Sequence, residues 1–308
     1  MNRSGLLIVD KPAGMTSHQV VSRIRRILGT RKVGHAGTLD PMATGVLICG
    51  VNRATRLMGH LALNDKSYQA TIRLGVVTDT EDADGQILSI QRADMSRDEI
   101  CSAMNRLTGS ILQRPSSVSA IKVDGKRSYA RVRAGEKVEL TPRPVHIAQF
   151  DLEQMRYVCV DGTDLIDLDV TVTCSSGTYI RALARDLGEL LGVGASLTML
   201  RRIRIGSYGI DQALPLDKVE SSDQLMSMVQ AASLSFPIIE LSNPHEILDV
   251  AFGRPLHRSI DQISAVVAED RLLGLFDRQD KIAVPKTIFL DGDDVADMRR
   301  RYGDNLLA

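Results

Sequence analysis

Cysteine is scarce in this chain, and its distribution argues against a disulfide or metal framework. The 308 residues contain four cysteines, with no CxxC pair and no cysteine-dense segment: Cys49, Cys101, Cys159 and Cys174. A small secreted domain would carry a denser, paired pattern, so we expect reduced and mostly buried thiols. The six histidines show no metal-ligand spacing with one another or with the cysteines. We therefore expect no zinc site and no other resident metal.

Long hydrophobic runs are also missing. No stretch approaches the ~18 unbroken apolar residues that read as a membrane span. The apolar run GLLIV, near the N-terminus, is too short for a secretory signal. Together with the scattered cysteines, this predicts a cytoplasmic protein that does not contact a membrane.

The formal net charge is zero, but basic and acidic residues are strongly segregated along the chain. Lys plus Arg and Asp plus Glu both number 38, which by itself argues against a polyanionic partner. Residues 1–60, however, carry nine basic and two acidic side chains, and residues 114–146 carry eight and three. Residues 211–308 reverse the balance, with seventeen acids and ten bases. This asymmetry predicts a polyanion-binding face, although single basic runs are often only solvated surface.

The hydrophobic patterns predict an α+β protein with a mixed, mainly antiparallel sheet flanked by helices. Strands are expected at the start of GLLIVDKPAG and in VLICGV, KSYQATIRLG and DLIDLDVTVTC, with helices at 16–29, 96–109 and through 182–191. The segment GHAGTLDPMATG between the first helix and VLICGV carries three glycines and a proline, so it is expected to be a loop.

A domain boundary is expected near residues 235–245, where two prolines interrupt the pattern. The residues that follow alternate like short strands joined by polar turns. A module of roughly sixty residues is at the limit of independent stability, so we expect it to lean on the main domain.

The acidic loop TDTEDADGQ, at 78–86, superficially suggests a calcium site. The order of ligands in an EF-hand is absent, because no Glu occupies the closing position and no pair of flanking helices is evident. Calcium binding there is therefore disfavoured.

One carboxylate, Asp40, lies alone among cations. Between Lys11 and Asn64 it faces eight Lys or Arg and no other acid. Asp before proline in a glycine-rich loop is often only a turn residue. Surrounding cations favour its charged form, however, and an ionised carboxylate on a polyanion-binding surface weakens binding unless it does chemistry. Ionised Asp is a competent nucleophile toward sugar carbons, and the bond between base and sugar in a nucleic acid is a glycosidic bond.

Five segments in order carry a resemblance. They are DKPAGMTS, GHAGTLDPMATGVL, KSYQATIRLG, SAIKVDGKRSYARVRAGE and SSGTYIRALARDLGELLG with LRRIRIG, spanning residue 5 to about 210. This set resembles the bacterial tRNA pseudouridine synthase family known as TruB. The resemblance implies a monomeric isomerase without a cofactor. It would flip out the T-loop uridine (position 55 in tRNA numbering), break its N-glycosidic bond and rejoin the ribose to C5 of the same base.

The resemblance also implies an architecture. Residues 1–240 would form a catalytic domain with the pseudouridine synthase fold, in which an insertion at about 112–146 grips the T arm of tRNA. Residues 241–308 would form a small PUA-like β module, whose acidic excess argues against strong phosphate contact.

Residue roles follow from the same resemblance. Asp40 would attack the flipped nucleotide at the sugar or at the base, Tyr68 would stack on the base and assist proton transfer, and Arg181 would pair with Asp40. The expected substrate-binding residues are His35, which fills the vacated stack, Tyr179 and Leu200 in the pocket wall, Lys11, and, in the insertion, Lys122, Lys126, Arg127, Arg131 and Arg133. The insertion is predicted to contain a strand, the turn VDGK and a helix that bears Lys126, Arg127, Arg131 and Arg133. Cations for phosphates and an aromatic for stacking suit an RNA-gripping element. This sequence departs from the family at Ser116, Ser117 and Val118, which leaves the role of the insertion standing but supports no claim about contacts from those three positions.

Simpler interpretations stand beside these roles. Tyr68 could be a core residue, Arg181 a surface cation and His35 a polar turn residue. The chain could also be a non-catalytic tRNA-binding or folding factor, or more remotely a relative that acts within a guide-RNA complex.

Overall fold

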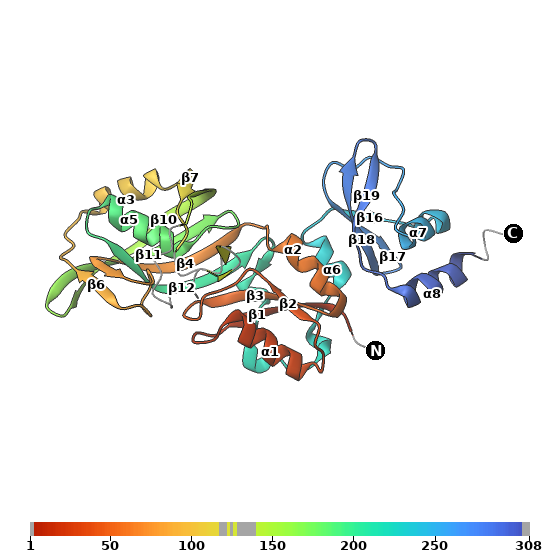
Figure 1. Cartoon of the computed structure of the whole chain (residues 1–308), viewed down its shortest axis with the longest axis horizontal. Helices are drawn as coiled ribbons and strands as arrows, with labels where there is room; N and C mark the ends of the chain where they lie inside the picture. The colour runs from red at the N-terminus through yellow and green to blue at the C-terminus, as the bar shows by residue number, and fades with distance from the viewer. Residues whose placement is uncertain (1–2, 117–121, 124–125, 128–139, 304–308) are drawn as a thin grey trace.

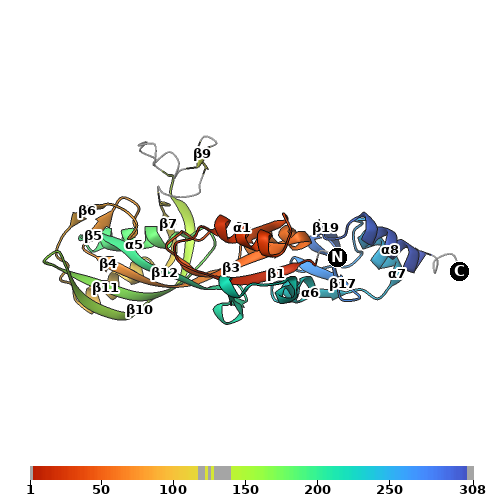
Figure 2. The ribbon, with the colours of Figure 1, turned by 90° about the horizontal axis from the view of Figure 1, so that it is seen from below.

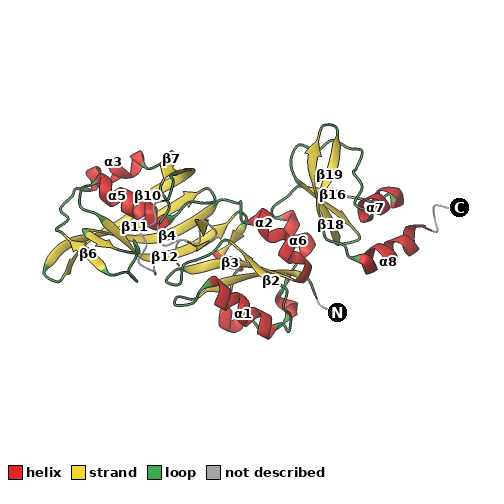
Figure 3. Cartoon of the chain, in the orientation of Figure 1, coloured by secondary structure: helices red, strands yellow, loops and turns green. Residues whose placement is uncertain are grey.

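A mixed sheet of 11 strands forms the body of the molecule over the described residues, which are 3–116, 122–123, 126–127 and 140–303 of this computed structural model (Figures 1 and 3). The order is β14-β1-β3-β12-β4-β11-β10-β7, with β15, β2 and β13 paired beside β1, β3 and β12. The strands are β1 (Gly5–Lys11), β2 (Val33–Ala36), β3 (Thr44–Val51), β4 (Lys66–Leu74), β7 (Gly109–Gln113), β10 (Arg143–Val160), β11 (Thr163–Cys174), β12 (Ala195–Ile205), β13 (Tyr208–Gly209), β14 (Leu214–Pro215) and β15 (Met226–Ser227). Only β1–β14 and β3–β12 pair in parallel within it. The predicted α+β class with a mainly antiparallel mixed sheet is confirmed.

Helices cover the sheet on both faces. They are α1 (Ser17–Ile27), α2 (Met58–Leu61), α3 (Arg97–Arg106), α5 (Ile180–Leu190) and α6 (Met228–Ser233), with 3-10 turns η1 (Asn52–Leu57), η2 (Ile210–Gln212), η3 (Leu216–Lys218) and η4 (Ser222–Gln224). Capping boxes form at Thr16 with Gln19 and at Ser96 with Glu99. Thus the helices at 16–29 and 96–109 were located correctly, within the fraying expected at helix ends.

Strand β1 is buried on both faces, which explains its continuous apolar run. Leu7 and Val9 join the cluster that packs against α1, whereas Leu6 and Ile8 join the cluster that contains α2 and α6. Figure 2 shows α1 and α6 on opposite sides of this part of the sheet. The other half is covered by α3 and α5, which pack on β4, β11 and β12 in a third cluster.

The loop expected at GHAGTLDPMATG begins later than predicted. Residues 33–36 form β2, which pairs with β3, so only the residues between Ala36 and Thr44 connect the two strands. The glycine and proline signal therefore located the turn, but the pairing of β2 depends on a strand that the local pattern does not reveal.

The two halves of the sheet join at β3 and β12, where Arg202 lies opposite Gly45. A Cβ atom at Gly45 would lie 2.1 Å from the backbone oxygen of Arg202, and its φ is +100°. Only glycine permits this close approach. The loop that carries Asp40 enters β3 at this junction.

The C-terminal module contains helices as well as the expected strands. Its sheet has the order β16-β17-β18-β19, and the elements are β16 (Ile238–Glu240), β17 (Ser264–Ala268), β18 (Arg271–Gln279), β19 (Ile282–Ile288), α7 (Pro244–Ala251) and α8 (Gly292–Gly303). The interpretation of this segment as strands alone was incomplete, because α7 and α8 were missed. No described helix is long and apolar enough to cross a membrane.

Two small hairpins complete the described chain. They are β5 (Val76–Thr78) with β6 (Ile87–Ile90), and β8 (Lys122–Val123) with β9 (Lys126–Arg127). The second hairpin lies in the expected insertion. The helix predicted to carry Lys126, Arg127, Arg131 and Arg133 is wrong for its first two residues, because Lys126 and Arg127 form β9 and pair with β8. Arg131 and Arg133 lie outside the described residues.

Candidate active site

The loop that carries Asp40 is held by the segment that follows β1. Ser17 accepts from the Leu39 amide at 2.9 Å and donates to the Leu39 carbonyl at 3.2 Å, and the Gly14 amide donates to the Pro41 carbonyl at 2.8 Å. Within the loop, the Ala43 amide donates to the Asp40 carbonyl at 3.1 Å. These backbone contacts fix the position of the carboxylate.

Lys11 is fully buried beneath this loop. Its ammonium donates to the carbonyls of Pro12, Met15 and Pro41 at 2.8, 2.6 and 3.1 Å, which uses all three of its donors. Burial lowers the pKa of Lys11 to about 8, although Asp40 opposes that shift. The geometry thus favours a role in holding the loop over the RNA contact expected from the sequence.

Arg181 lies beside Asp40, as the resemblance implies. Its Nε donates to Asp40 Oδ2 at 2.9 Å, and its side chain is 5% exposed, against 34% for Asp40. Because Arg181 is buried and Asp40 is partly exposed, the Asp40 carboxylate stays accessible to a substrate. The simpler interpretation of Arg181 as a surface cation is wrong.

The acidic loop at 78–86 supplies counter-charges for α5, a role that the sequence did not reveal. Asp82 is buried, and its Oδ2 lies 3.3 Å from Arg181 Nη1. Glu81 Oε1 lies 2.6 Å from Arg185 Nη1. Burial raises the pKa of Asp82, and hydrogen bonding from Thr80 and the charge of Arg181 oppose that rise. Among the residues described, no group of three or more His, Cys, Asp or Glu could hold a metal.

Arg202, also missed from the sequence, holds the same loop from the other side. It is 1% exposed and donates to the carbonyls of Val46 at 2.8 Å, Gly37 at 3.0 Å and Thr38 at 3.5 Å. The guanidinium of Arg181 thus contacts Asp40 directly, whereas that of Arg202 fixes the loop backbone at Gly37 and Thr38, just before Asp40. The LRR segment was the available signal, but only Leu200 was taken from it.

A cavity of about 280 Å³ opens beside Asp40. It is lined by Gly37, Thr38, Leu39, Asp40, Ala62, Lys66, Tyr68, Gly177, Thr178, Tyr179, Ile180, Arg181, Leu200 and Arg202. The structure thus brings Asp40, Tyr68, Arg181, Tyr179 and Leu200 to one cavity from the loop before β3, from β4, from the N-terminal end of α5 and from β12. Burial raises the pKa of Tyr68, so its hydroxyl is neutral at neutral pH. The cavity combines an aromatic and an apolar wall with one carboxylate.

The wall formed by Tyr179 is fixed by Gln113, the last residue of β7. The Gln113 amide donates to the Tyr179 carbonyl at 3.1 Å and accepts from its N–H at 2.9 Å. Three residues on, Ser116 is fully buried and accepts from Arg181 at 3.4 Å. The sequence supported no claim about contacts at Ser116, and the structure places its hydroxyl beside Arg181.

His35 lies in β2 and does not line the cavity. Its ring meets that of His18 edge to face at 5.8 Å, and its Nδ1 is buried with no hydrogen-bond partner among the described residues. Burial, with smaller contributions from the charges of His18 and Arg202, lowers the pKa of His35 to about 4. The ring is therefore neutral at neutral pH, as suits stacking in an RNA helix.

The basic residues expected in the insertion are only partly placed. Lys122, Lys126 and Arg127 lie in the β8–β9 hairpin, and nothing beyond that backbone placement is described. Arg131 and Arg133 lie outside the described residues.

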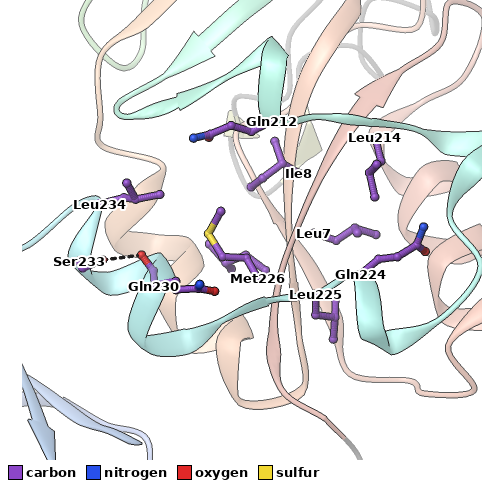
Figure 4. Close-up of a pocket in the computed structure, with 11 residues that line it drawn as sticks. Leu7, Ile8, Gln212, Leu214, Gln224, Leu225, Met226, Gln230, Ser233 and Leu234 are labelled. Carbon is purple, nitrogen blue, oxygen red and sulfur yellow. Dashed lines mark hydrogen bonds between the residues drawn. The ribbon is translucent and has the colours of Figure 1, made fainter. Parts of the chain in front are cut away.

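A larger cavity, of about 460 Å³, lies between β1 and α6 (Figure 4). The residues lining it are leucine, isoleucine, methionine, glutamine and serine, so none of them is ionisable. Volume alone therefore does not locate the chemistry, which requires the charged groups of the smaller cavity.

Comparison with known proteins gives consistent matches. Residues 25–180 match the family described as TruB family pseudouridylate synthase, N-terminal domain, and residues 181–234 match the tRNA pseudouridylate synthase B C-terminal domain. The chain is 53% identical over 256 residues to tRNA pseudouridine synthase B of Corynebacterium aurimucosum, covering 82% of this chain and 84% of that one. It is 52% identical over 279 residues to the protein of that name from Mycobacteroides abscessus, covering 89% and 92%. A chain of a solved Cbf5-Nop10-Gar1 complex superposes with a TM-score of 0.68 at 26% identity, covering 94% and 86%.

Proposed function

This chain belongs to the TruB family of pseudouridylate synthases, and on that premise we propose that it isomerises the T-loop uridine of tRNA with Asp40 as the nucleophile. The observation that carries the proposal is the Asp40–Arg181 pair at the cavity, at 2.9 Å. Relatives that share about half of the sequence are named tRNA pseudouridine synthase B, which does not favour a non-catalytic tRNA-binding factor.

The carboxylate can begin the reaction in either of two ways. If an Asp40 oxygen attacks C1′, the C1′–N1 bond breaks and its electron pair leaves with the uracil. If it adds to C6, the electron pair of the C5–C6 double bond moves toward C5 and the C4 carbonyl. Either route ends with a C1′–C5 bond, loss of the C5 proton and protonation of N1, so the atoms balance without a further reactant. Arg181 supports both routes, because its guanidinium holds the carboxylate in place through a charge-assisted hydrogen bond.

The cavity walls suit an everted base. Flipping a nucleotide out of folded RNA costs a few kcal/mol, and contacts with aromatic and apolar side chains offset part of that cost. Tyr68, Tyr179 and Leu200 line the cavity and provide such contacts. The neutral ring of His35 would occupy the vacated stack, and the insertion with its basic residues would hold the T stem-loop.

The remaining parts of the proposal concern organisation. We assign residues 1–240 to the catalytic domain and 241–308 to the C-terminal module, except that β16 (Ile238–Glu240) pairs with β17 and so belongs to the module. We also propose a monomer that works in the cytoplasm. The four cysteines are unpaired in the structure, which supports a reducing compartment.

The decisive test replaces Asp40 by Asn. We expect Asp40→Asn to abolish pseudouridine formation while tRNA affinity is kept or improved, since the change removes the nucleophile and one negative charge from the RNA face. Tritium release from uridine-labelled tRNA measures turnover, chemical mapping of pseudouridine locates the product, and filter binding measures affinity. Asp98→Asn, on the exposed surface of α3, is the matched control. Full turnover by Asp40→Asn would remove the catalytic assignment.

A further inference from the structure

Three basic side chains line the cavity, and two of them have their charge directed into the protein. Arg181 contacts Asp40, Asp82 and the Thr80 carbonyl, and Arg202 contacts three backbone carbonyls. The third, Lys66, is 7% exposed and donates to the carbonyls of Ala62 at 2.9 Å and Asn64 at 2.7 Å. An ammonium group has three N–H donors. One donor of Lys66 therefore remains after these two contacts, in a residue of the cavity wall.

The position of this donor relates it to the base. Lys66 and Tyr68 are two residues apart on β4, so their side chains leave the same face of the sheet. Both line the cavity. A base stacked on Tyr68 would thus lie beside the Lys66 ammonium.

The reaction creates a need for a cation at this place. When Asp40 attacks C1′, the departing uracil is an anion with charge on O2 and O4, and when it adds to C6, charge develops toward O4. In both cases a carbonyl oxygen of the base becomes more negative in the transition state. A preorganised donor in a water-poor site stabilises such charge strongly.

We propose that the Lys66 ammonium donates its remaining hydrogen bond to a carbonyl oxygen of the everted uracil and stabilises the negative charge that develops there. This rests on the proposed function. It gives Lys66 a catalytic role, separate from the anchoring of Lys11 and Arg202. Burial lowers the pKa of Lys66 to about 8, with a smaller contribution from Arg202, while Cys174 and Asp65 oppose the shift. The group is therefore still charged at neutral pH.

The first experiment separates rate from binding. Lys66→Met should lower the single-turnover rate of pseudouridine formation by about 10²–10³-fold, the usual cost of one oxyanion donor, and leave the Kd for tRNA within about twofold. Lys281→Met, in the exposed turn between β18 and β19, makes the same charge change away from the cavity and should leave both unchanged. A weaker Kd with an unchanged rate would mean that Lys66 binds a phosphate, and would overturn the proposal.

The second experiment identifies the contact with the base. Sulfur is a poorer hydrogen-bond acceptor than oxygen, so one of two substrates, with 2-thiouridine or 4-thiouridine at the target, should react more slowly with the wild type. The sulfur substitution that slows the wild type should have little further effect on the rate of the Lys66→Met variant. Additive losses for both thio substrates would refute the contact.

Two further variants guard against a purely structural effect. Lys66→Gln keeps a donor but no charge and should be slow, whereas Lys66→Arg keeps the charge and should recover part of the rate. If Lys66→Met does not fold, the rates with the 2-thiouridine and 4-thiouridine substrates are compared in these two variants instead. Equal rates for Gln and Arg would contradict the role of charge. If the wild type itself forms no pseudouridine in tRNA, the proposed function fails instead.

Discussion

At the scale of single residues, buried cations with backbone partners define this site. Lys11, Lys66 and Arg202 each donate to two or three carbonyls. Motif order was sufficient to predict Asp40, Tyr68 and Arg181 as neighbours. It could not predict that Arg202 is buried, because its partners at Gly37 and Val46 lie more than 150 residues away in sequence. Basic residues were therefore assigned to an RNA-facing surface, which for Lys11 does not fit the structure.

The depressed pKa of His35 gives a prediction for stability. The folded pKa is about 4 against an ordinary 6.5, so between these values the unfolded chain binds a proton that the folded chain excludes. Stability should thus be full above pH 6.5 and decline as the pH falls toward 4, by at most about 3 kcal/mol from this group. His35→Phe keeps a ring without titrating, so its decline over that range should be smaller. Urea unfolding at pH 7 and pH 5 measures the difference.

The neighbours of His35 define the control for that measurement. His18 and Arg202 are the charged or titratable groups that oppose its protonation. His146→Phe, at an exposed position of β10, removes a different histidine from the titration. It should follow the wild type. An identical pH dependence for the wild type and His35→Phe would contradict the assigned pKa.

At the scale of secondary-structure elements, the start of the insertion is tied to the helix that carries Arg181. Gln113 pairs with the backbone of Tyr179, which is the N-cap residue of α5, and the Arg114 carbonyl accepts from Arg185 at 2.7 Å. The insertion that we propose to hold the T stem-loop is thereby joined to the cavity wall. Sequence periodicity predicted α5 and the strand before it, but a side chain that replaces a backbone partner leaves no periodic signal.

Removal of the Gln113 amide should weaken both the fold and the catalysis. Gln113→Ala removes two hydrogen bonds to the Tyr179 backbone, each worth about 0.5–1.5 kcal/mol. We expect a lower free energy of unfolding in urea and a lower single-turnover rate, because the first turn of α5 positions Arg181.

Gln69→Ala provides the comparison for Gln113→Ala, since Gln69 is exposed on β4. Its free energy of unfolding should change by less than about 0.5 kcal/mol. A Gln113→Ala variant as stable and as fast as Gln69→Ala would show that the bridge to α5 does not matter.

At the scale of the whole molecule, the C-terminal module shares a hydrophobic cluster with the main sheet. Leu6 and Leu61 from the main body and Leu275 and Phe289 from the module belong to that one cluster. Arg53 adds ion pairs to Asp291 and, at 2.5 Å, to Asp294. The sequence located the composition change near residues 235–245, and the module's sheet begins there with β16. Composition could not show the shared core, because it consists of ordinary apolar residues whose partners only the fold determines.

Because of this shared core, the module and the main body should unfold together. Phe289 is 1% exposed, and Phe289→Ala should cost about 3–5 kcal/mol through the cavity that it leaves. The chain contains no tryptophan, so Leu190→Trp and Ile238→Trp, at partly exposed positions, can report separately on α5 and on β16. Both reporters should show one coincident urea transition, and Phe289→Ala should lower its midpoint for both.

The control for Phe289→Ala is Phe252→Ala, where the ring is 48% exposed and the cost should be about 1 kcal/mol or less. Independent modules would give a different result: the reporter on β16 would shift with Phe289→Ala while the reporter on α5 stayed in place. Coincident shifts would mean that the acidic module supports the catalytic sheet through its core, since Leu6 of β1 and Leu61 of α2 lie in the same cluster as Phe289. Loss of that support would then reach the active cavity through Ala62, which directly follows α2 and lines the wall.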